Sequence, residues 1–231
     1  MAARLHKPLW GLALIVLAYG LWRALTVPDD YQQGATVKIM FVHVPAAWMA
    51  LFGYSFIFFA SVTALVFRHP LGHVAARAAA PVGATFTAIA LVTGSLWGQP
   101  MWGTWWVWDA RLTSELVLLF LYLGVIALYA SFEDKVLAAR AAGILAIVGV
   151  VNIPIIKYSV DWWSSLHQPA TIKITEKSTM TGDMLYLLIL NIFGFGMMIG
   201  AITLVRFRAE VLARNGMRPW VRALATQEVS K

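Results

Sequence analysis

The chain has 231 residues, of which 60% are hydrophobic and 13% are charged, and its formal net charge is +7. A water-soluble domain needs more charged side chains than this to cover its surface, so the composition excludes an ordinary soluble protein and indicates a membrane protein. The chain has no cysteine, which excludes disulfides, thiolate metal sites and a cysteine nucleophile.

Six stretches are long and apolar enough to cross a membrane, and we expect them to form one all-α, polytopic membrane domain that covers residues 1–231. The first stretch could also be a signal peptide, but no small-x-small cleavage pattern follows it, so we predict an uncleaved first span. Pro154 is expected to kink the fifth span. The predicted spans are residues 9–27, 39–67, 78–97, 116–132, 141–156 and 184–205.

The distribution of basic residues predicts which ends of the spans face the cytoplasm. Twelve of the 18 Lys and Arg residues fall on the side that holds both termini, six of them in the tail 206–231. Because an excess of Lys and Arg marks the cytoplasmic side, we expect both termini inside and three segments outside: 28–38, 97–115 and 157–183. The basic tail is interpreted as this topology signal, with attraction to anionic lipid, and not as a nucleic-acid site.

Two of the five histidines, His43 and His167, fall on the predicted outer side, and each stands two residues before a proline. The simplest interpretation is that each imidazole bonds a backbone group at a proline turn. Two imidazoles on one side of the membrane could also ligate a single iron from opposite faces of a porphyrin. A zinc site would need further ligands, which no histidine cluster supplies.

The position of His43 depends on where the second helix begins. Proline suits the first turn of a helix, so the helix is predicted to begin in earnest at Pro45, with His43 just above the membrane. The alternative is a helix from Val37 that is kinked near Pro45, which places His43 slightly deeper.

The segment 97–115 is unusually rich in tryptophan, with five between residues 97 and 108. An aromatic belt at the membrane interface explains one or two tryptophans at the end of a span, but not five in one loop. Indole faces offer a broad, rigid, apolar surface that suits a large flat macrocycle. The spacing of Trp102, Trp105, Trp106 and Asp109 predicts a short surface helix over 102–112, and Thr113-Ser114-Glu115 offers capping residues for the next span.

Charged side chains near this loop are interpreted in the same way. Arg111 and Lys38 are the candidate cations for the propionates of a porphyrin. Asp109 is expected to brace the loop, against Arg111 or indole N–H groups. Asp109 and Glu115 could instead perform acid–base chemistry, but bracing and a negative charge near a helix start explain them more simply. We therefore do not expect an enzyme.

The stretch Trp102-Gly103-Thr104-Trp105-Trp106-Val107-Trp108-Asp109 resembles the "WWD" signature of the haem-handling membrane proteins of cytochrome c assembly. With the segments around His43 and His167, the six spans and the short length, the whole chain resembles the cytochrome c maturation protein C (CcmC) family, also called haem exporter protein C. The larger haem lyase subunits share the signature but have more spans than 231 residues allow.

The resemblance implies that haem b is held on the periplasmic face of a bacterial inner membrane, with His43 and His167 as axial ligands of its iron. It implies that Lys38 and Arg111 contact the propionates. Arginine is commoner in the family at the position of Lys38, and lysine pairs less strongly with a carboxylate. The signature residues implied to bind the porphyrin are Trp102, Trp105, Trp106, Trp108 and Asp109.

The resemblance also implies partners: the haem chaperone CcmE, to which haem is presented, and the CcmA ATPase with the membrane subunits CcmB and CcmD. The chain has no phosphate-binding loop of the Gly-x-x-x-x-Gly-Lys type, so any ATP dependence is expected to come from a partner. Two alternatives remain, a transmembrane haem exporter subunit of an ABC-type complex and a purely structural permease subunit. Few polar residues and no histidine are expected at mid-membrane, which favours handling of haem at the outer face.

Overall fold

The computed structural model describes residues 2–167, 178 and 180–221, and over these residues it is all-helical. Six helical segments are long and apolar enough to cross a membrane, which confirms the predicted number of spans. The short turn η1 leads into α2, and α5 and α6 together make the fifth span. In chain order the elements are α1 (Ala2–Thr26), η1 (Ala35–Ile39), α2 (Met40–Leu65), α3 (Gly72–Trp102), α4 (Ala110–Ser131), α5 (Lys135–Gly149), α6 (Asn152–Trp162) and α7 (Gly182–Arg214).

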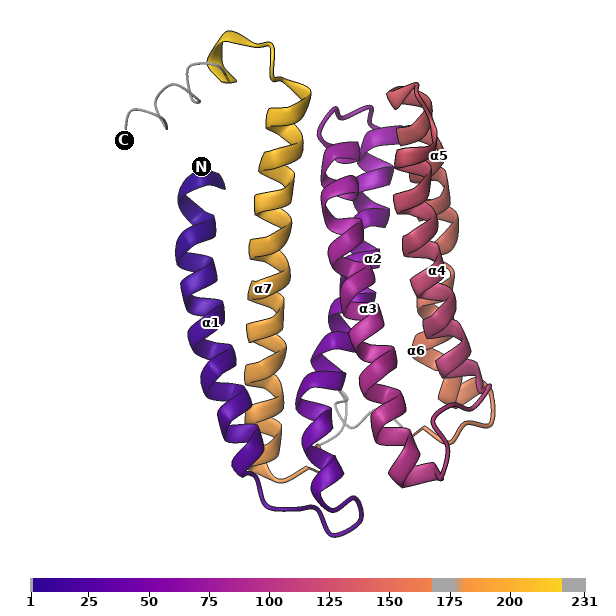
Figure 1. Cartoon of the computed structure of the whole chain (residues 1–231). Helices are drawn as coiled ribbons and strands as arrows, with labels where there is room; N and C mark the ends of the chain where they lie inside the picture. The colour runs from indigo at the N-terminus through magenta and orange to yellow at the C-terminus, as the bar shows by residue number, and fades with distance from the viewer. Residues whose placement is uncertain (1, 168–177, 179, 222–231) are drawn as a thin grey trace.

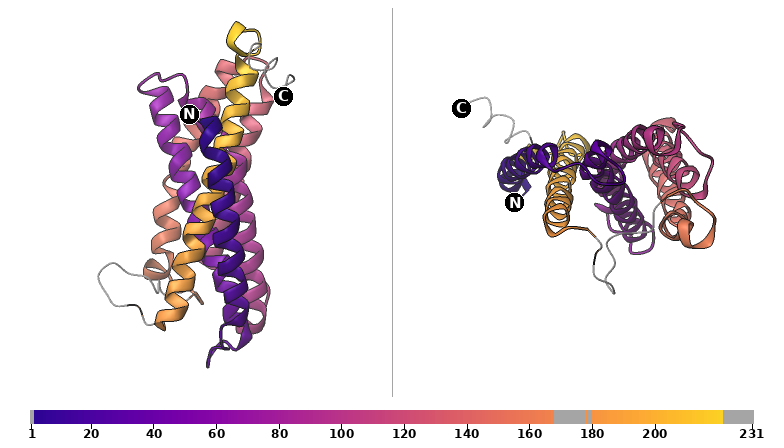
Figure 2. Two further views of the ribbon diagram at one scale, coloured as in Figure 1. Left: turned by 90° about the vertical axis from the view of Figure 1, so that its left-hand side faces the viewer. Right: turned by 90° about the horizontal axis from the view of Figure 1, so that it is seen from below.

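The helices form a bundle with two flanks around a central pair (Figures 1 and 2). Helices α2 and α3 pack along each other in the middle, α7 lies against both and carries α1 on its other side, and α4 packs with α5 and α6 on the opposite flank. The start of α1 and the end of α7 lie at one end of the bundle, as an even number of crossings requires. Residues 27–39, 103–109 and 163–167 form the other end, called here the tryptophan end.

The helices extend beyond the predicted spans because hydropathy marks only the apolar part of a helix, whereas caps decide where it ends. Helix α5 begins at an N-cap in which the Asp134 carboxylate accepts from the Val136 N–H at 2.7 Å. Helix α6 continues to Trp162, so Lys157, expected in the outer segment 157–183, is helical.

Pro45 and Pro154, from which the start of the second helix and a kink in the fifth span were predicted, both lie within helices. Pro45 lies inside α2, so the helix does not begin there, and His43 lies in its first turn, nearer to the alternative that we considered. The fifth span is interrupted between Gly149 and Asn152, just before Pro154. This is the expected place, because a proline cannot donate to the carbonyl four residues earlier and its ring crowds that carbonyl.

Small residues on α3 let neighbouring helices approach closely, as is common between membrane helices. At Gly83 the side chain of Tyr122, from α4, crosses α3 and donates its hydroxyl hydrogen to the Ala50 carbonyl of α2 at 2.8 Å. A Cβ atom at Gly83 would lie 2.2 Å from the Tyr122 hydroxyl oxygen. The contact between the central pair and α4 therefore depends on a residue without a side chain at this position.

Replacing Gly83 with alanine is expected to destabilise the bundle by about 1–3 kcal/mol, the usual cost of overpacking a core. Thermal unfolding of the purified protein in detergent measures the effect. The matched control is Gly196→Ala on α7, where a Cβ would meet nothing closer than the Met49 sulfur at 3.9 Å. Equal melting temperatures for the two variants would contradict this account of the packing.

Candidate functional site

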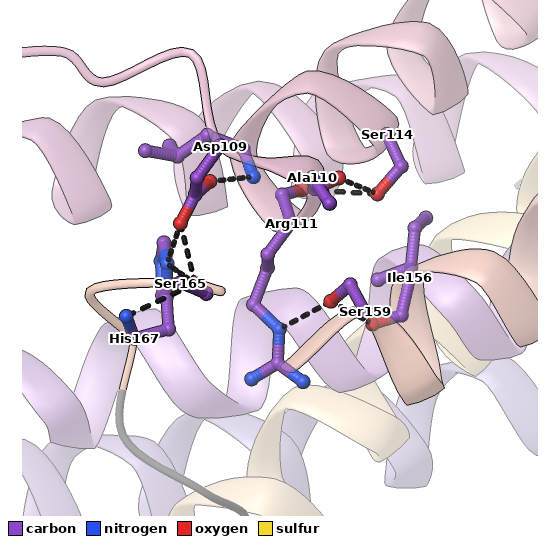
Figure 3. Close-up of polar contacts among 9 residues, drawn as sticks. Asp109, Ala110, Arg111, Ser114, Ile156, Ser159, Ser165 and His167 are labelled. Carbon is purple, nitrogen blue, oxygen red and sulfur yellow. Dashed lines mark hydrogen bonds and ion pairs between the residues drawn. The ribbon is translucent and has the colours of Figure 1, made fainter. Parts of the chain in front are cut away.

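Asp109 joins two segments of the tryptophan end (Figure 3). It is the N-cap of α4, where one carboxylate oxygen accepts from the Leu112 N–H at 2.8 Å. The other oxygen, Oδ2, accepts from Nδ1 of His167 at 2.9 Å and from the Ser165 hydroxyl. Burial alone would raise the pKa of Asp109, but these hydrogen bonds outweigh it and leave the pKa below its usual value. Asp109 thus braces His167, whereas we had expected it to brace Arg111 or an indole.

His167 is held on three sides. Its backbone N–H donates to the Ser165 hydroxyl at 3.1 Å, and its ring meets the Trp102 ring edge-on, with centroids 4.9 Å apart. Burial lowers the pKa of His167 below its usual 6.5, although Asp109 opposes the shift. The neutral ring donates its Nδ1 hydrogen to Asp109, since a carboxylate can only accept, so the lone pair lies on Nε2. With the residues that the structure describes, this Nε2 makes no hydrogen bond.

His43 is oriented in the same sense by a different partner. Its Nδ1 lies 3.0 Å from the Ala90 carbonyl oxygen and 3.1 Å from the Thr93 hydroxyl, both on α3. A carbonyl can only accept, so Nδ1 carries the hydrogen and Nε2 carries the lone pair. A Cβ atom at Gly94 would lie 3.1 Å from Cε1 of the ring, so the glycine makes room for it. The imidazole of His43 therefore bonds a backbone carbonyl, as the simplest interpretation expected, but that carbonyl lies on α3 and not at a proline turn. The imidazole of His167 bonds a carboxylate instead.

Arg111 lies in the first turn of α4, close to both histidines. Its Nε donates to the Ser159 hydroxyl at 3.2 Å (Figure 3). Its Nη2 donates to the Lys157 carbonyl at 3.4 Å. Arg111 is near enough for its positive charge to act on both the His43 and the His167 rings. It is therefore a cation held in place near the two imidazoles.

Lys38 is engaged elsewhere at the tryptophan end. Its ammonium group pairs with the Asp29 carboxylate at 3.0 Å. The segment around it packs on the end of α3, where Gln33 accepts from the Trp97 indole N–H at 2.9 Å. Among the described contacts, none brings Lys38 to a histidine or to the tryptophan loop.

The tryptophan loop differs from the predicted surface helix. Helix α3 ends at Trp102, its C-cap Gly103 has a φ of 75° that favours glycine, and residues 103–109 are not helical. The prediction of a helix over 102–112 is therefore wrong, and so is the capping role of Thr113-Ser114-Glu115, which lie within α4. A left-handed glycine ends the helical path that the tryptophan spacing had suggested.

The tryptophans of the loop form pairs and an exposed surface. Trp97 packs edge-on against Trp102, and Trp106 against Trp108, with centroids 5.1 and 5.4 Å apart. Trp105 and Trp108 are 59% and 77% exposed, which leaves large apolar faces uncovered. Trp105 and Trp106 also line a shallow apolar groove of about 320 Å³ between α3 and α4, together with Leu91, Val92, Ser95, Leu96 and Leu116.

The donor set fits haem better than an isolated metal ion. Within the described part of the chain, no group of three His, Cys, Asp or Glu side chains could hold a metal. Haem needs only axial ligands from the protein, and two neutral imidazoles whose Nε2 atoms make no hydrogen bond with residues 2–167, 178 or 180–221 are of the right kind. Sequence reasoning missed Thr93, Ser159 and Ser165, since single hydroxyl residues carry no signal until the fold shows their partners.

Comparison with known proteins gives consistent results. A family model described as "Heme exporter protein C" matches residues 1–222. The chain is 48% identical over 231 residues to a "Heme exporter protein C" of Bradyrhizobium diazoefficiens, which covers 100% of this chain and 86% of that protein. It is 52% identical over 215 residues to the "Heme exporter protein C" of Haemophilus influenzae, a match that covers 93% of this chain and 87% of that protein. It is 50% identical over 213 residues to the "Heme exporter protein C" of Escherichia coli K12, a match that covers 92% of this chain and 86% of that protein.

Proposed function

The chain belongs to the heme exporter protein C family, and from that premise we propose that it holds haem b at the tryptophan end, with His43 and His167 as axial ligands. One observation carries the proposal. Both imidazoles use Nδ1 to bond an acceptor, Ala90 O for His43 and the Asp109 carboxylate for His167. Each ring is thus held in the tautomer that offers Nε2 to a metal.

The other residues of the site have distinct roles in this proposal. Bound haem supplies an iron with two axial positions and two propionates. Arg111 pairs with one propionate, because its guanidinium is already held by Ser159 beside both histidines. The exposed faces of Trp105 and Trp108 cover the porphyrin, while Trp106 packs on Trp108 and Trp102 packs on His167. Lys38 must leave Asp29 before it can reach a propionate.

Location and partners follow from the same proposal. The smaller number of basic residues near the tryptophan end supports a periplasmic orientation of that end, and the bacterial relatives support an inner-membrane location. There the haem is displayed to the chaperone CcmE. CcmB and CcmD are the other membrane subunits, and CcmA hydrolyses ATP. The chain itself has no enzymatic role.

The name of the relatives, "Heme exporter protein C", favours a second function, movement of haem across the membrane. A conduit needs polar or ligating groups along a path. Among the described residues, the buried polar side chains deep in the spans are few, and Thr87 and Asn191 each donate to a carbonyl of their own helix. We therefore favour binding and display of haem over transport.

The purified, haem-loaded protein is expected to show the visible spectrum of low-spin haem with two imidazole ligands, and its pigment is expected to be extractable as haem b. The measurement is an absorption spectrum before and after addition of pyridine. A chain purified from haem-sufficient membranes that binds no haem would contradict the proposal. Transport of haem into liposomes that contain only this chain would instead favour the second function.

A further inference from the structure

The two imidazoles proposed as axial ligands differ in the charge of the groups that hold them. Nδ1 of His167 donates to the Asp109 carboxylate at 2.9 Å, whereas Nδ1 of His43 donates to the Ala90 carbonyl oxygen at 3.0 Å. The first acceptor is an anion and the second is a neutral dipole. The two ligands are therefore unequal, although both are histidines.

Both described partners of the His43 Nδ1 atom are neutral. The second partner is the Thr93 hydroxyl, 3.1 Å away. This hydroxyl donates its hydrogen to the Ile89 carbonyl at 2.6 Å, so its oxygen faces the His43 ring as a further neutral acceptor. The positive charge of Arg111 acts on both histidine rings in the same direction. The Asp109 carboxylate is thus the group that makes the two ligands different.

The carboxylate beside His167 is charged and shielded from water. The side chain of Asp109 is 8% exposed and that of His167 is 16% exposed. Burial would raise the pKa of Asp109, but hydrogen bonds from Ser165, Leu112 and His167 outweigh it, so the group is ionised at neutral pH. Water screens such a charge only slightly, and it therefore acts strongly on the neighbouring imidazole.

Ser165 shares the oxygen atom of Asp109 that holds His167 (Figure 3). Its hydroxyl donates to Oδ2, the same atom that accepts from Nδ1 of His167. The Ser165 oxygen also accepts from the His167 backbone N–H at 3.1 Å. A carboxylate that accepts an additional hydrogen bond is a weaker base toward its other donors. Ser165 thus reduces the pull of Asp109 on the ring hydrogen of His167.

A hydrogen bond to an anion makes an imidazole a stronger ligand. A carboxylate that attracts the Nδ1 hydrogen increases the electron density at Nε2 and so raises the basicity of the ring toward a metal. Oxidised iron is stabilised more than reduced iron by a strong electron donor. Hydrogen bonds around an axial ligand are therefore one of the means by which a protein sets the reduction potential of haem.

We propose that Asp109 makes His167 the stronger electron donor of the two axial ligands, that Ser165 limits this effect, and that the two residues together set the reduction potential of the bound haem. This inference rests on the proposed function. Asp109 and Ser165 are positioning residues in it, because both act on the iron only through His167.

Reduction potentials of the haem-loaded full chain in detergent, followed through the low-spin absorption band, test the inference. Asp109→Asn is expected to weaken the preference for oxidised over reduced iron about tenfold, which raises the potential by about 59 mV for a one-electron couple. Ser165→Ala leaves Oδ2 to His167 alone and should lower the potential, whereas Ser165→Thr keeps a hydroxyl and should retain the native value. The matched control is Asp134→Asn at the N-cap of α5, which should leave the potential unchanged.

A measurement without haem separates the inference from the haem site. In protein labelled with nitrogen-15 histidine, the proton on Nδ1 of His167 is expected at lower field in Ser165→Ala, and at higher field in Asp109→Asn, than in the native protein. A native potential in Asp109→Asn would overturn the inference and leave the haem site standing. A shift of the same sign in Asp109→Asn and Ser165→Ala would also overturn it, because general loosening of the site acts in one direction. If the native protein binds no haem, the proposed function is wrong and this inference falls with it, while the resonances still show whether Asp109 bonds to His167.

Discussion

Replacing His43 or His167 with alanine is expected to abolish the low-spin haem spectrum and to lower haem affinity. Loss of a residue that only hydrogen-bonds to a metal ligand lowers affinity roughly 10- to 100-fold, and loss of the ligand itself should lower it by more than that. Each variant removes one of the two Nε2 atoms that make no hydrogen bond with the described residues, so one axial position of the iron loses its protein ligand. The remaining five-coordinate haem should be high-spin. Haem titrations and absorption spectra of the purified variants measure both effects.

His69→Ala is the matched control for these two variants, since His69 lies between α2 and α3 at the end away from the tryptophans. It is expected to bind haem as the native protein does. If His43→Ala and His167→Ala both retain the low-spin spectrum and the native haem content, the axial ligands lie elsewhere.

Changing Asp109 to asparagine is expected to weaken haem binding about 10- to 100-fold while leaving the helices in place. The amide oxygen of asparagine can still cap α4 at the Leu112 N–H, because asparagine is as good an N-cap as aspartate. The amide group cannot also accept the His167 Nδ1 hydrogen through a second oxygen, so the ring loses its orientation and its negative partner. The spectrum should show a mixture of low-spin and high-spin haem.

Asp134→Asn controls for the capping effect, because Asp134 caps α5 at the opposite end in the same way. Both variants should lose similar, small amounts of thermal stability, and only Asp109→Asn should lose haem affinity. Equal haem affinities in the two variants would mean that the Asp109–His167 contact does not serve ligation.

The predicted pH dependence has a definite sign. A protonated imidazole cannot ligate iron, and burial keeps the pKa of His167 below its usual 6.5. The native protein should therefore hold haem at neutral pH and release it as the pH falls through this lowered pKa. In Asp109→Asn the carboxylate that raises this pKa is gone, so the variant's affinity, measured by haem titrations relative to its own value at neutral pH, should begin to fall at a lower pH than that of the native protein.

The sequence by itself determined the six spans and the gathering of His43, His167 and the tryptophans at one end. Both results have a local cause: backbone groups in a membrane must bond within their own helix, so apolar length predicts each crossing, and the number of crossings sorts the segments by side. Tertiary structure alone decided the acceptors of the two imidazoles, since Ala90 and Asp109 lie 47 and 58 residues from the histidines that they orient. Tertiary structure also decided that the tryptophan segment is a loop. Gly103 adopts a left-handed backbone conformation and Asp109 bonds to His167, and these two features outweigh the helical spacing of the tryptophans.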